Sequence, residues 1–368
     1  MKYYLIAGEA SGDLHGARLI EALRAQDPKA SIRCWGGDLM QQAGGTLIKH
    51  YRDLAFMGFW EVLINLPTIL KNIHFCKTDI IAFDPDVIVY IDYPGFNLRI
   101  AEWARKKGYR NHYYISPQLW AWKANRAVKM KRDLDALYTI LPFEKSYFKE
   151  KHNYEVHYVG HPLLDSLAKC LPPKDFRKAH ALDNRPIVAL LPGSRQQEVK
   201  KMLPLFLKLI PAFPDYQFVI AGTPTLGEAY YTPIMDSQAC KIVVGNTYAL
   251  LQSSEAALVT SGTATLETAL FEVPQVVCYK TSEFSYWLAK KWVTLQWISL
   301  VNLIFNREIV DELIQEKCSV ENLEKALYKI LSPEGKARLK KQYQQLSRQL
   351  DKGGASQKTA ALILEALP

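Results

Sequence analysis

The sequence predicts an α/β protein made of two doubly wound, Rossmann-like domains, followed by a helical C-terminal region. Short apolar runs that end in glycine or an acid alternate with amphipathic helical segments, and this alternation occurs twice along the chain. The chain also has 368 residues, whereas a single core rarely grows beyond about 250–300 residues. Both observations favour two domains with mainly parallel sheets.

Strand signals in the first half alternate with helical periodicity. The expected strands lie at residues 2–8, 31–37, 86–92, 111–116, 136–142 and 154–160, with helices at 17–26, 61–83 and 96–108. The second half repeats the theme, with strands at 186–195, 216–222, 241–246, 256–262 and 275–280. The last part of the chain has helical periodicity at 320–331, 334–350 and 356–367.

The domain boundaries follow from a stretch without strand signals. Residues 165–186 carry prolines and charges and form the best linker candidate. We therefore expect an N-terminal Rossmann-like domain at 1–168, a C-terminal Rossmann-like domain at 169–340, and C-terminal helices at 341–368. The sequence leaves open whether those helices cross back to the first domain or pair with another subunit.

Composition narrows the functional classes without choosing among them. The formal charge of +9 is compatible with a solvated basic surface, an anionic membrane surface or a phosphorylated substrate. Nucleic acid ranks last because the chain has neither zinc-finger spacing nor an RNP-like aromatic motif. The six scattered cysteines include no CxxC pair, which is typical of reduced thiols in the cytoplasm. The sequence has no signal-peptide pattern and no apolar run of membrane-spanning length, so any membrane contact should be peripheral.

Glycine-rich loops follow three of the expected strands. The first is GEASGDLHG at residues 8–16, where backbone amides could approach an anion and where Ser11 or Asp13 could equally cap the helix. The second is LPGSR, in which Arg195 offers positive charge for a diphosphate or is a plain surface arginine. The third is SGTATLE at residues 261–267, where Glu267 could accept hydrogen bonds from ribose or belong to a capping box.

An acid and two tryptophans follow two other strands. Asp92 ends the apolar run DVIVYID, so its carboxylate should lie at the strand's carboxyl end, where it could take a proton from an attacking hydroxyl or simply shape a turn before Pro94. Trp120 and Trp122 in SPQLWAW could stack on a sugar or pack in the core. Because all these segments follow strands, we expect them to converge on one crevice.

Taken together, the motifs resemble those of the lipid-A-disaccharide synthases, a family of GT-B glycosyltransferases whose two domains face a cleft. The resemblance rests on the strings AGEASGDLHGARLI, IDYPGFN, SPQLWAWK, LPGSRQQEV, SGTATLE and VNLIFNREIVDELIQ, which occur in family order. Lys123 departs from the arginine that often follows WAW, so the charge remains but a bidentate contact would not.

The resemblance implies an inverting hexosyl transfer that uses neither metal nor cofactor. The donor would be UDP-2,3-diacylglucosamine and the acceptor lipid X, 2,3-diacylglucosamine 1-phosphate, giving a β-1,6-linked disaccharide 1-phosphate and UDP. The domain at 1–168 would bind the acceptor and the domain at 169–340 would bind the UDP-sugar. Asp92 would be the general base and Arg195 would bind the UDP phosphates. The remaining substrate-binding residues implied by the motifs are Glu9, Ser11, Asp13, Asn97, Trp120, Trp122, Ser261, Gly262, Thr263, Glu267 and Asn302.

Acylated substrates would also explain two apolar, aromatic stretches, at residues 56–64 and 284–300. The first could line acyl chains or touch the inner face of the inner membrane of a Gram-negative bacterium. The second could lie at that membrane surface or equally be a core helix with a basic solvent edge. A homodimer stays open. The alternatives are another GT-B UDP-sugar enzyme, such as a lipid-linked glycosyltransferase or a UDP-GlcNAc epimerase, and a non-catalytic membrane-associated UDP-sugar binder.

Overall fold

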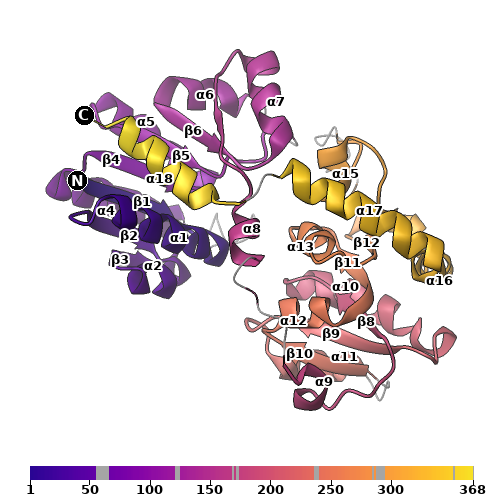
Figure 1. Cartoon of the computed structure of the whole chain (residues 1–368). Coiled ribbons are helices and arrows are strands. Elements are labelled where there is room, and N and C mark those ends of the chain that lie inside the picture. The colour runs from indigo at the N-terminus through magenta and orange to yellow at the C-terminus, as the bar shows by residue number, and fades with distance from the viewer. Residues whose placement is uncertain are drawn as a thin grey trace. The chain divides into compact units, whose positions relative to one another are not determined.

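The computed structural model describes residues 1–54, 66–120, 125–167, 170, 174–235, 240–283, 286, 295–350 and 353–367. The chain forms two compact units. The first contains Met1–Ser166 together with Leu350–Pro368, and the second contains Leu167–Gln349. Each unit has its own parallel sheet with helices on its faces (Figure 1), as the alternation of strand and helix signals predicts.

The first unit contains a seven-stranded sheet in the order β3-β2-β1-β4-β5-β6-β7. Every pair of neighbouring strands is parallel. The elements are β1 (Lys2–Ala7), α1 (Ala10–Gln26), β2 (Ser31–Gly36), α2 (Asp38–Gln42), β3 (Thr46–His50), α4 (Leu66–Phe83), β4 (Val87–Ile91), α5 (Pro94–Lys106), β5 (Asn111–Tyr114), α6 (Arg126–Asp133), β6 (Ala136–Thr139), α7 (Pro142–His152), β7 (His157–Tyr158), α8 (Pro162–Leu167) and α18 (Ala355–Glu365).

The central strand β1 is apolar on both faces because helices cover both. Tyr3 and Leu5 belong to the core cluster that includes residues of α1 and α18. Tyr4 and Ile6, which alternate with them, belong to the cluster that includes residues of α4, α5 and α6. This alternation of side chains across a strand explains why a doubly covered parallel strand is a continuous apolar run.

The second unit contains a six-stranded parallel sheet in the order β10-β9-β8-β11-β12-β13. Its elements are α9 (Phe176–Ala179), β8 (Ile187–Leu191), α10 (Gln196–Leu207), β9 (Gln217–Gly222), α11 (Glu228–Met235), β10 (Cys240–Val244), α12 (Thr247–Gln252), β11 (Ser254–Thr260), α13 (Ala264–Leu270), β12 (Gln275–Tyr279), α15 (Leu300–Phe305), β13 (Glu312–Ile314), α16 (Val320–Leu331) and α17 (Pro333–Gln349).

The two C-terminal helices belong to different units. Helix α17 contacts α13, α15 and α16 of the second unit, and α18 contacts α1 of the first. The yellow α18 therefore lies among the indigo and purple elements in Figure 1. The chain divides after Ser166 and again after Gln349, so the helix that the sequence analysis grouped with α18 from residue 341 lies in the second unit.

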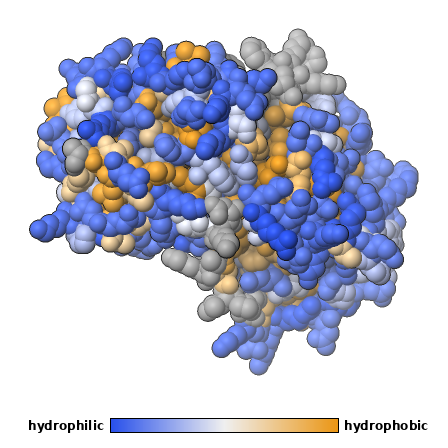
Figure 2. All heavy atoms as spheres, turned by 45° about the horizontal axis from the view of Figure 1, so that its top comes forward, coloured by the Kyte–Doolittle hydropathy of each residue, from blue (hydrophilic) through white to orange (hydrophobic). Residues whose placement is uncertain are grey.

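Hydrophilic residues dominate the surface on the face shown in Figure 2, and apolar residues form smaller patches between them. None of the helices in the described ranges is both long enough and apolar enough to cross a bilayer.

Candidate active site

In the first unit, the loops that follow β1 and β4 lie side by side. The two strands are parallel neighbours with Ala7 opposite Ile91, so the next residues, Gly8 and Glu9, lie beside Asp92 and Tyr93. Asp92 is half-buried, and burial together with the nearby negative charge of Glu9 raises its pKa to about 6. A carboxylate with such a pKa is ionised at neutral pH and still accepts a proton more readily than an ordinary aspartate does.

The backbone that carries this carboxylate has an uncommon conformation. Asp92 and Tyr93 are consecutive left-handed residues, with φ of 44° and 51°. A side chain in this region costs about 1–2 kcal/mol per residue, so surrounding contacts must hold the turn. Asn97 donates a 2.7 Å hydrogen bond from Nδ2 to the Asp92 carbonyl oxygen, and the Tyr113 hydroxyl donates to the same oxygen over 2.5 Å.

Other residues of the first glycine-rich loop have different surroundings. Glu9 and Ser11 are exposed at the start of α1. Asp13 is buried and accepts hydrogen bonds from the backbone amides of Gly37 (2.7 Å), Leu39 (3.2 Å) and Met40 (3.0 Å). Its carboxylate therefore holds the start of α2. Asp13 itself lies within α1, so it does not cap the helix that follows its own loop.

The tryptophan segment is only partly described. Trp120 donates a 3.2 Å hydrogen bond from its indole nitrogen to Glu144 and packs edge-on against Phe143, with ring centroids 5.1 Å apart. Glu144 is buried and also accepts from the backbone amides of Ile140 and Leu141. Burial raises the pKa of Glu144 to about 7. Trp122 lies outside the described residues, as do most of the expected interfacial stretches at 56–64 and 284–300.

In the second unit, a cavity of about 480 Å³ lies beyond the carboxyl ends of β9 and β10. Its lining includes Pro224, Asn246, Tyr248 and Glu267. Burial raises the pKa of Glu267, and the Tyr248 hydroxyl donates a 3.3 Å hydrogen bond to it. A cavity of this size, with an aromatic ring and a carboxylate, fits a nucleoside.

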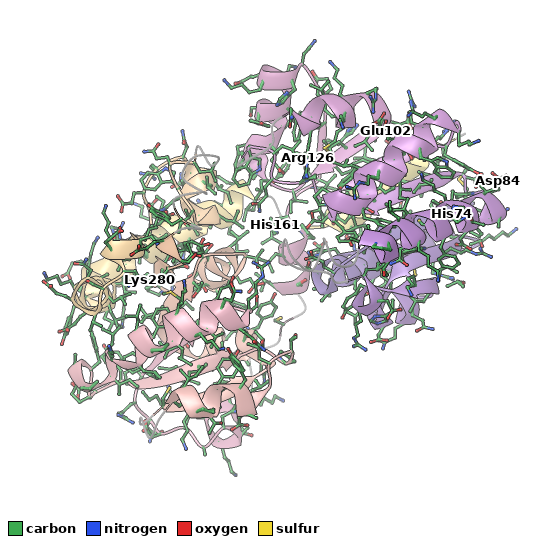
Figure 3. The ribbon with its side chains drawn as sticks, turned by 180° about the vertical axis from the view of Figure 1, so that it is seen from behind. His74, Asp84, Glu102, Arg126, His161 and Lys280 are labelled. Atoms are coloured by element: carbon green, nitrogen blue, oxygen red, sulfur yellow. The ribbon has the colours of Figure 1, made fainter. Side chains whose placement is uncertain are left out.

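A second, smaller cavity of about 160 Å³ gathers positive charge. Arg195, Lys201 and Lys280 line it, together with Glu198, Thr281 and Ser282. Lys280, labelled in Figure 3, directly follows β12. Glu198 accepts hydrogen bonds from the backbone amides of Ser194 and Arg195, so these two amides are already engaged. The Arg195 guanidinium also lies 3.7 Å from the Glu198 carboxylate, so this acid offsets part of the positive charge of the cavity.

The loop SGT after β11 is tied to the segment before α15. Gly262 and Thr263 are exposed, and the Ser261 hydroxyl donates to the Ile298 carbonyl oxygen over 2.9 Å. Glu312 accepts from the backbone amides of Ile298 and Ser299, at 2.8 and 2.9 Å.

Asn302 lies at the centre of the same network. Its Nδ2 donates to the Val310 carbonyl oxygen and to Glu312, and its Oδ1 accepts from the amides of Ile309 and Val310, at 2.7 to 3.0 Å. Asn302 is fully buried. Both polar atoms of the Asn302 side chain are thus hydrogen-bonded to other groups of the second unit.

Several residues of these sites were not singled out from the sequence. Lys280 directly follows the strand QVVCY, so its place at a strand end can be seen in the sequence, as that of Asp92 can. Tyr113, Glu144 and Glu312 carry no such signal, because a tyrosine within an apolar strand resembles core, and the two acids resemble helix or strand surface.

Two parallel-sheet α/β units, each with its polar residues at the carboxyl ends of strands, define a GT-B protein. Solved structures share this fold: the UDP-GlcNAc 2-epimerase of Neisseria meningitidis, bound to UDP-GlcNAc, aligns with a TM-score of 0.68 at 14% identity over 99% of this chain and 100% of that chain. The glycotransferase of kitacinnamycin aligns with a TM-score of 0.65 at 14% identity over 100% and 99% of the two chains.

Sequence comparison then identifies the family. The family model described as lipid-A-disaccharide synthetase matches residues 3–366. The lipid-A-disaccharide synthase of Trichlorobacter lovleyi is 36% identical over 98% of this chain and 96% of its own length. The chain belongs to the lipid-A-disaccharide synthetase family and is a glycosyltransferase, which confirms the resemblance in its motifs.

Proposed function

We propose that this chain transfers 2,3-diacylglucosamine from its UDP derivative to the 6-hydroxyl of 2,3-diacylglucosamine 1-phosphate. The relative named above is called a lipid-A-disaccharide synthase, and the substrates follow from the reaction of that family. The observation that carries the chemical step is Asp92, a half-buried carboxylate whose pKa is raised to about 6. Its carbonyl oxygen accepts two side-chain hydrogen bonds that help to fix the turn.

In this reaction Asp92 accepts the proton of the acceptor hydroxyl. The hydroxyl oxygen forms a bond with the anomeric carbon of the donor. The bond from that carbon to the diphosphate oxygen breaks, and its electron pair leaves with UDP. Attack opposite the leaving group inverts the anomeric centre.

The second unit would bind the donor nucleotide. The cavity lined by Tyr248 and Glu267 suits the nucleoside, with the carboxylate accepting hydrogen bonds from ribose hydroxyls. The cavity lined by Arg195, Lys201 and Lys280 suits the diphosphate, because three cations stabilise the negative charge that grows on the leaving group. Ser261, Gly262 and Thr263 offer hydroxyl and backbone groups in a further strand-end loop.

The decisive experiment measures UDP release from the purified chain given UDP-2,3-diacylglucosamine in mixed micelles, with and without 2,3-diacylglucosamine 1-phosphate. We expect release that depends on the acceptor, with a disaccharide product. Asp92→Asn should lower kcat by at least about 100-fold while UDP affinity stays within twofold. UDP release that does not depend on the acceptor would refute the proposed reaction. An active Asp92→Asn variant would refute the assignment of Asp92 as the base.

We also propose that the first unit docks on an anionic membrane surface, where acylated substrates reside. Helix α4 exposes Leu70 and Ile81, at 58% and 55% of their surface, on one helical stripe with His74 and Lys77. Apolar side chains beside the Lys77 cation suit the boundary between headgroups and acyl chains.

Co-sedimentation with vesicles of phosphatidylglycerol and phosphatidylethanolamine tests this docking. Leu70→Ser with Ile81→Ser should release most of the bound protein. Val128→Ser, which removes an apolar side chain on α6 that is 67% exposed, serves as the control. If the parent protein, the double variant and Val128→Ser all bound the vesicles equally, α4 would be excluded as the docking surface.

A further inference from the structure

The turn that presents Asp92 depends on groups that do not reach its carboxylate. Three hydrogen bonds hold its backbone: the Asp92 amide donates to the Tyr114 carbonyl oxygen over 3.1 Å, and the Asp92 carbonyl oxygen accepts from both Asn97 and Tyr113. All three contacts are to main-chain atoms. They fix where the carboxylate points without contacting the carboxylate itself.

Tyr113 has few alternatives for its hydroxyl. Its side chain is fully buried in the core cluster between β4, β5 and α5, and its ring lies 5.9 Å from that of Tyr90, its partner across the two strands. Buried hydroxyls are costly when unpaired, so the bond to Asp92 is maintained whenever this core is intact.

Asn97 is equally constrained. It is fully buried at the start of α5, and besides the Asp92 oxygen its Nδ2 lies 3.3 Å from the Ile6 carbonyl oxygen and 3.4 Å from that of Ile91. The amide therefore joins the carboxyl ends of β1 and β4 to the turn. This contact set describes a residue that supports the backbone of the site.

We infer that Tyr113 and Asn97 are positioning residues that hold Asp92 in its reactive orientation by clamping its carbonyl oxygen. The inference rests on the proposed role of Asp92 as general base. It assigns Asn97 to the support of the base, where its family motif suggested substrate binding, and it adds Tyr113, which lies outside that motif.

The pKa of Asp92, measured from the pH profile of kcat, distinguishes a positioning role from a contribution to stability alone. The groups facing this turn are Glu9 from the loop after β1, Tyr93, and Tyr113 of β5, while the guanidinium of Arg126 (Figure 3) acts on the Tyr113 hydroxyl. Burial is the main cause of the raised pKa of Asp92. A released turn would let the carboxylate reach water, and its pKa would fall toward the ordinary value.

Tyr113→Phe tests the inference, with Tyr90→Phe as the matched control. Both variants remove one hydroxyl from a fully buried tyrosine, and the Tyr90 hydroxyl donates to Asn111 rather than to the turn. We expect both to lower the urea midpoint similarly. Only Tyr113→Phe should lower kcat at least tenfold, keep both KM values within twofold, and move the acid limb of the kcat profile to lower pH.

Asn97→Ser tests the second donor independently and should move the acid limb in the same direction. The inference would be overturned if Tyr113→Phe had the same kcat, and the same acid limb in its pH profile, as Tyr90→Phe. It would also be overturned if the acid limb of Asn97→Ser did not move. Either result, combined with an inactive Asp92→Asn variant, would leave the base assignment standing. An active Asp92→Asn variant would instead remove the base on which the inference rests.

Discussion

The ring of Tyr93 covers Gly8 so closely that a Cβ atom on Gly8 would lie 2.3 Å from two ring carbons. Real Cβ atoms do not approach other atoms so closely, so any side chain at residue 8 must displace the ring. Tyr93 is the second left-handed residue of the turn that carries Asp92. A side chain added at Gly8 would therefore shift Asp92 through the ring of Tyr93.

Gly8→Ala should therefore lower kcat about tenfold, because a displaced Tyr93 moves Asp92, and misplacement of about 1 Å can cost as much as 100-fold in rate. The control is Gly95→Ala in the first turn of α5. A Cβ there meets no atom within 4 Å, so this variant should keep its activity and gain slightly in stability. Steady-state kinetics on both variants checks the expectation, and equal kcat values would contradict it.

The positions of the strands along the chain, and the polar residues at their carboxyl ends, could be predicted from the sequence because both depend on local patterns. The run DVIVYID places Asp92 at a strand end whatever the rest of the chain does. The first loop was harder, because its Asp13 binds the amide of Gly37, 24 residues away. Only the tertiary structure shows that α2 needs this cap.

The same limit applies to residues whose partners are distant along the chain. Ser261 bonds the carbonyl oxygen of Ile298, 37 residues away, and Tyr113 bonds that of Asp92, 21 residues away. A hydroxyl in a strand or a loop carries no sign of such a partner in its neighbours. The motifs therefore located the strand-end loops, but only the fold shows which residues of each loop have structural partners elsewhere in the chain.

Glu9→Gln should shift the pH dependence of the reaction. The negative charge of Glu9 is the second cause, after burial, of the raised pKa of Asp92. The base must be ionised, so activity is lost as the pH falls through about 6 in the parent protein. Removing the charge lowers the pKa of Asp92, so the acid limb of the kcat profile should move to lower pH.

The control for that variant is Glu102→Gln, which removes an acid from α5 (Figure 3). Glu102 pairs with Lys106 over 3.2 Å at the surface, and the pKa of Asp92 has no contribution from it. Its acid limb should coincide with that of the parent protein. An unmoved limb in Glu9→Gln would show that burial alone sets the pKa of Asp92.

Asn302→Ala should destabilise the second unit, because it leaves the buried amides of Ile309 and Val310 without their side-chain acceptor. It also removes one hydrogen bond from Glu312, which keeps those from two backbone amides. We expect a loss of about 2–4 kcal/mol in the free energy of unfolding, as for the breaking of a buried polar network. Urea denaturation followed by fluorescence measures this.

Asn322→Ala is the matched control for that measurement. Its side chain donates one hydrogen bond, to the Lys317 carbonyl oxygen at the surface, so the loss should stay below about 1 kcal/mol. If Asn302→Ala proved as stable as Asn322→Ala but failed to bind UDP, the substrate-binding role expected from the family motif would be favoured over the structural one.

Arg195→Ala should weaken UDP binding at least tenfold, since the proposed diphosphate site would lose one of its three cations, and charge-assisted hydrogen bonds contribute about 1.5–3 kcal/mol each. The remaining affinity should depend less on salt, because one ionic contact is gone. Isothermal titration with UDP at low and high ionic strength measures both effects. Lys325→Ala removes the same charge from a side chain that is 71% exposed, close to the 70% of Arg195, and should bind UDP normally. If the two variants bound UDP equally well, the leaving-group charge would have to be stabilised elsewhere, and Lys280 would be the next residue to replace.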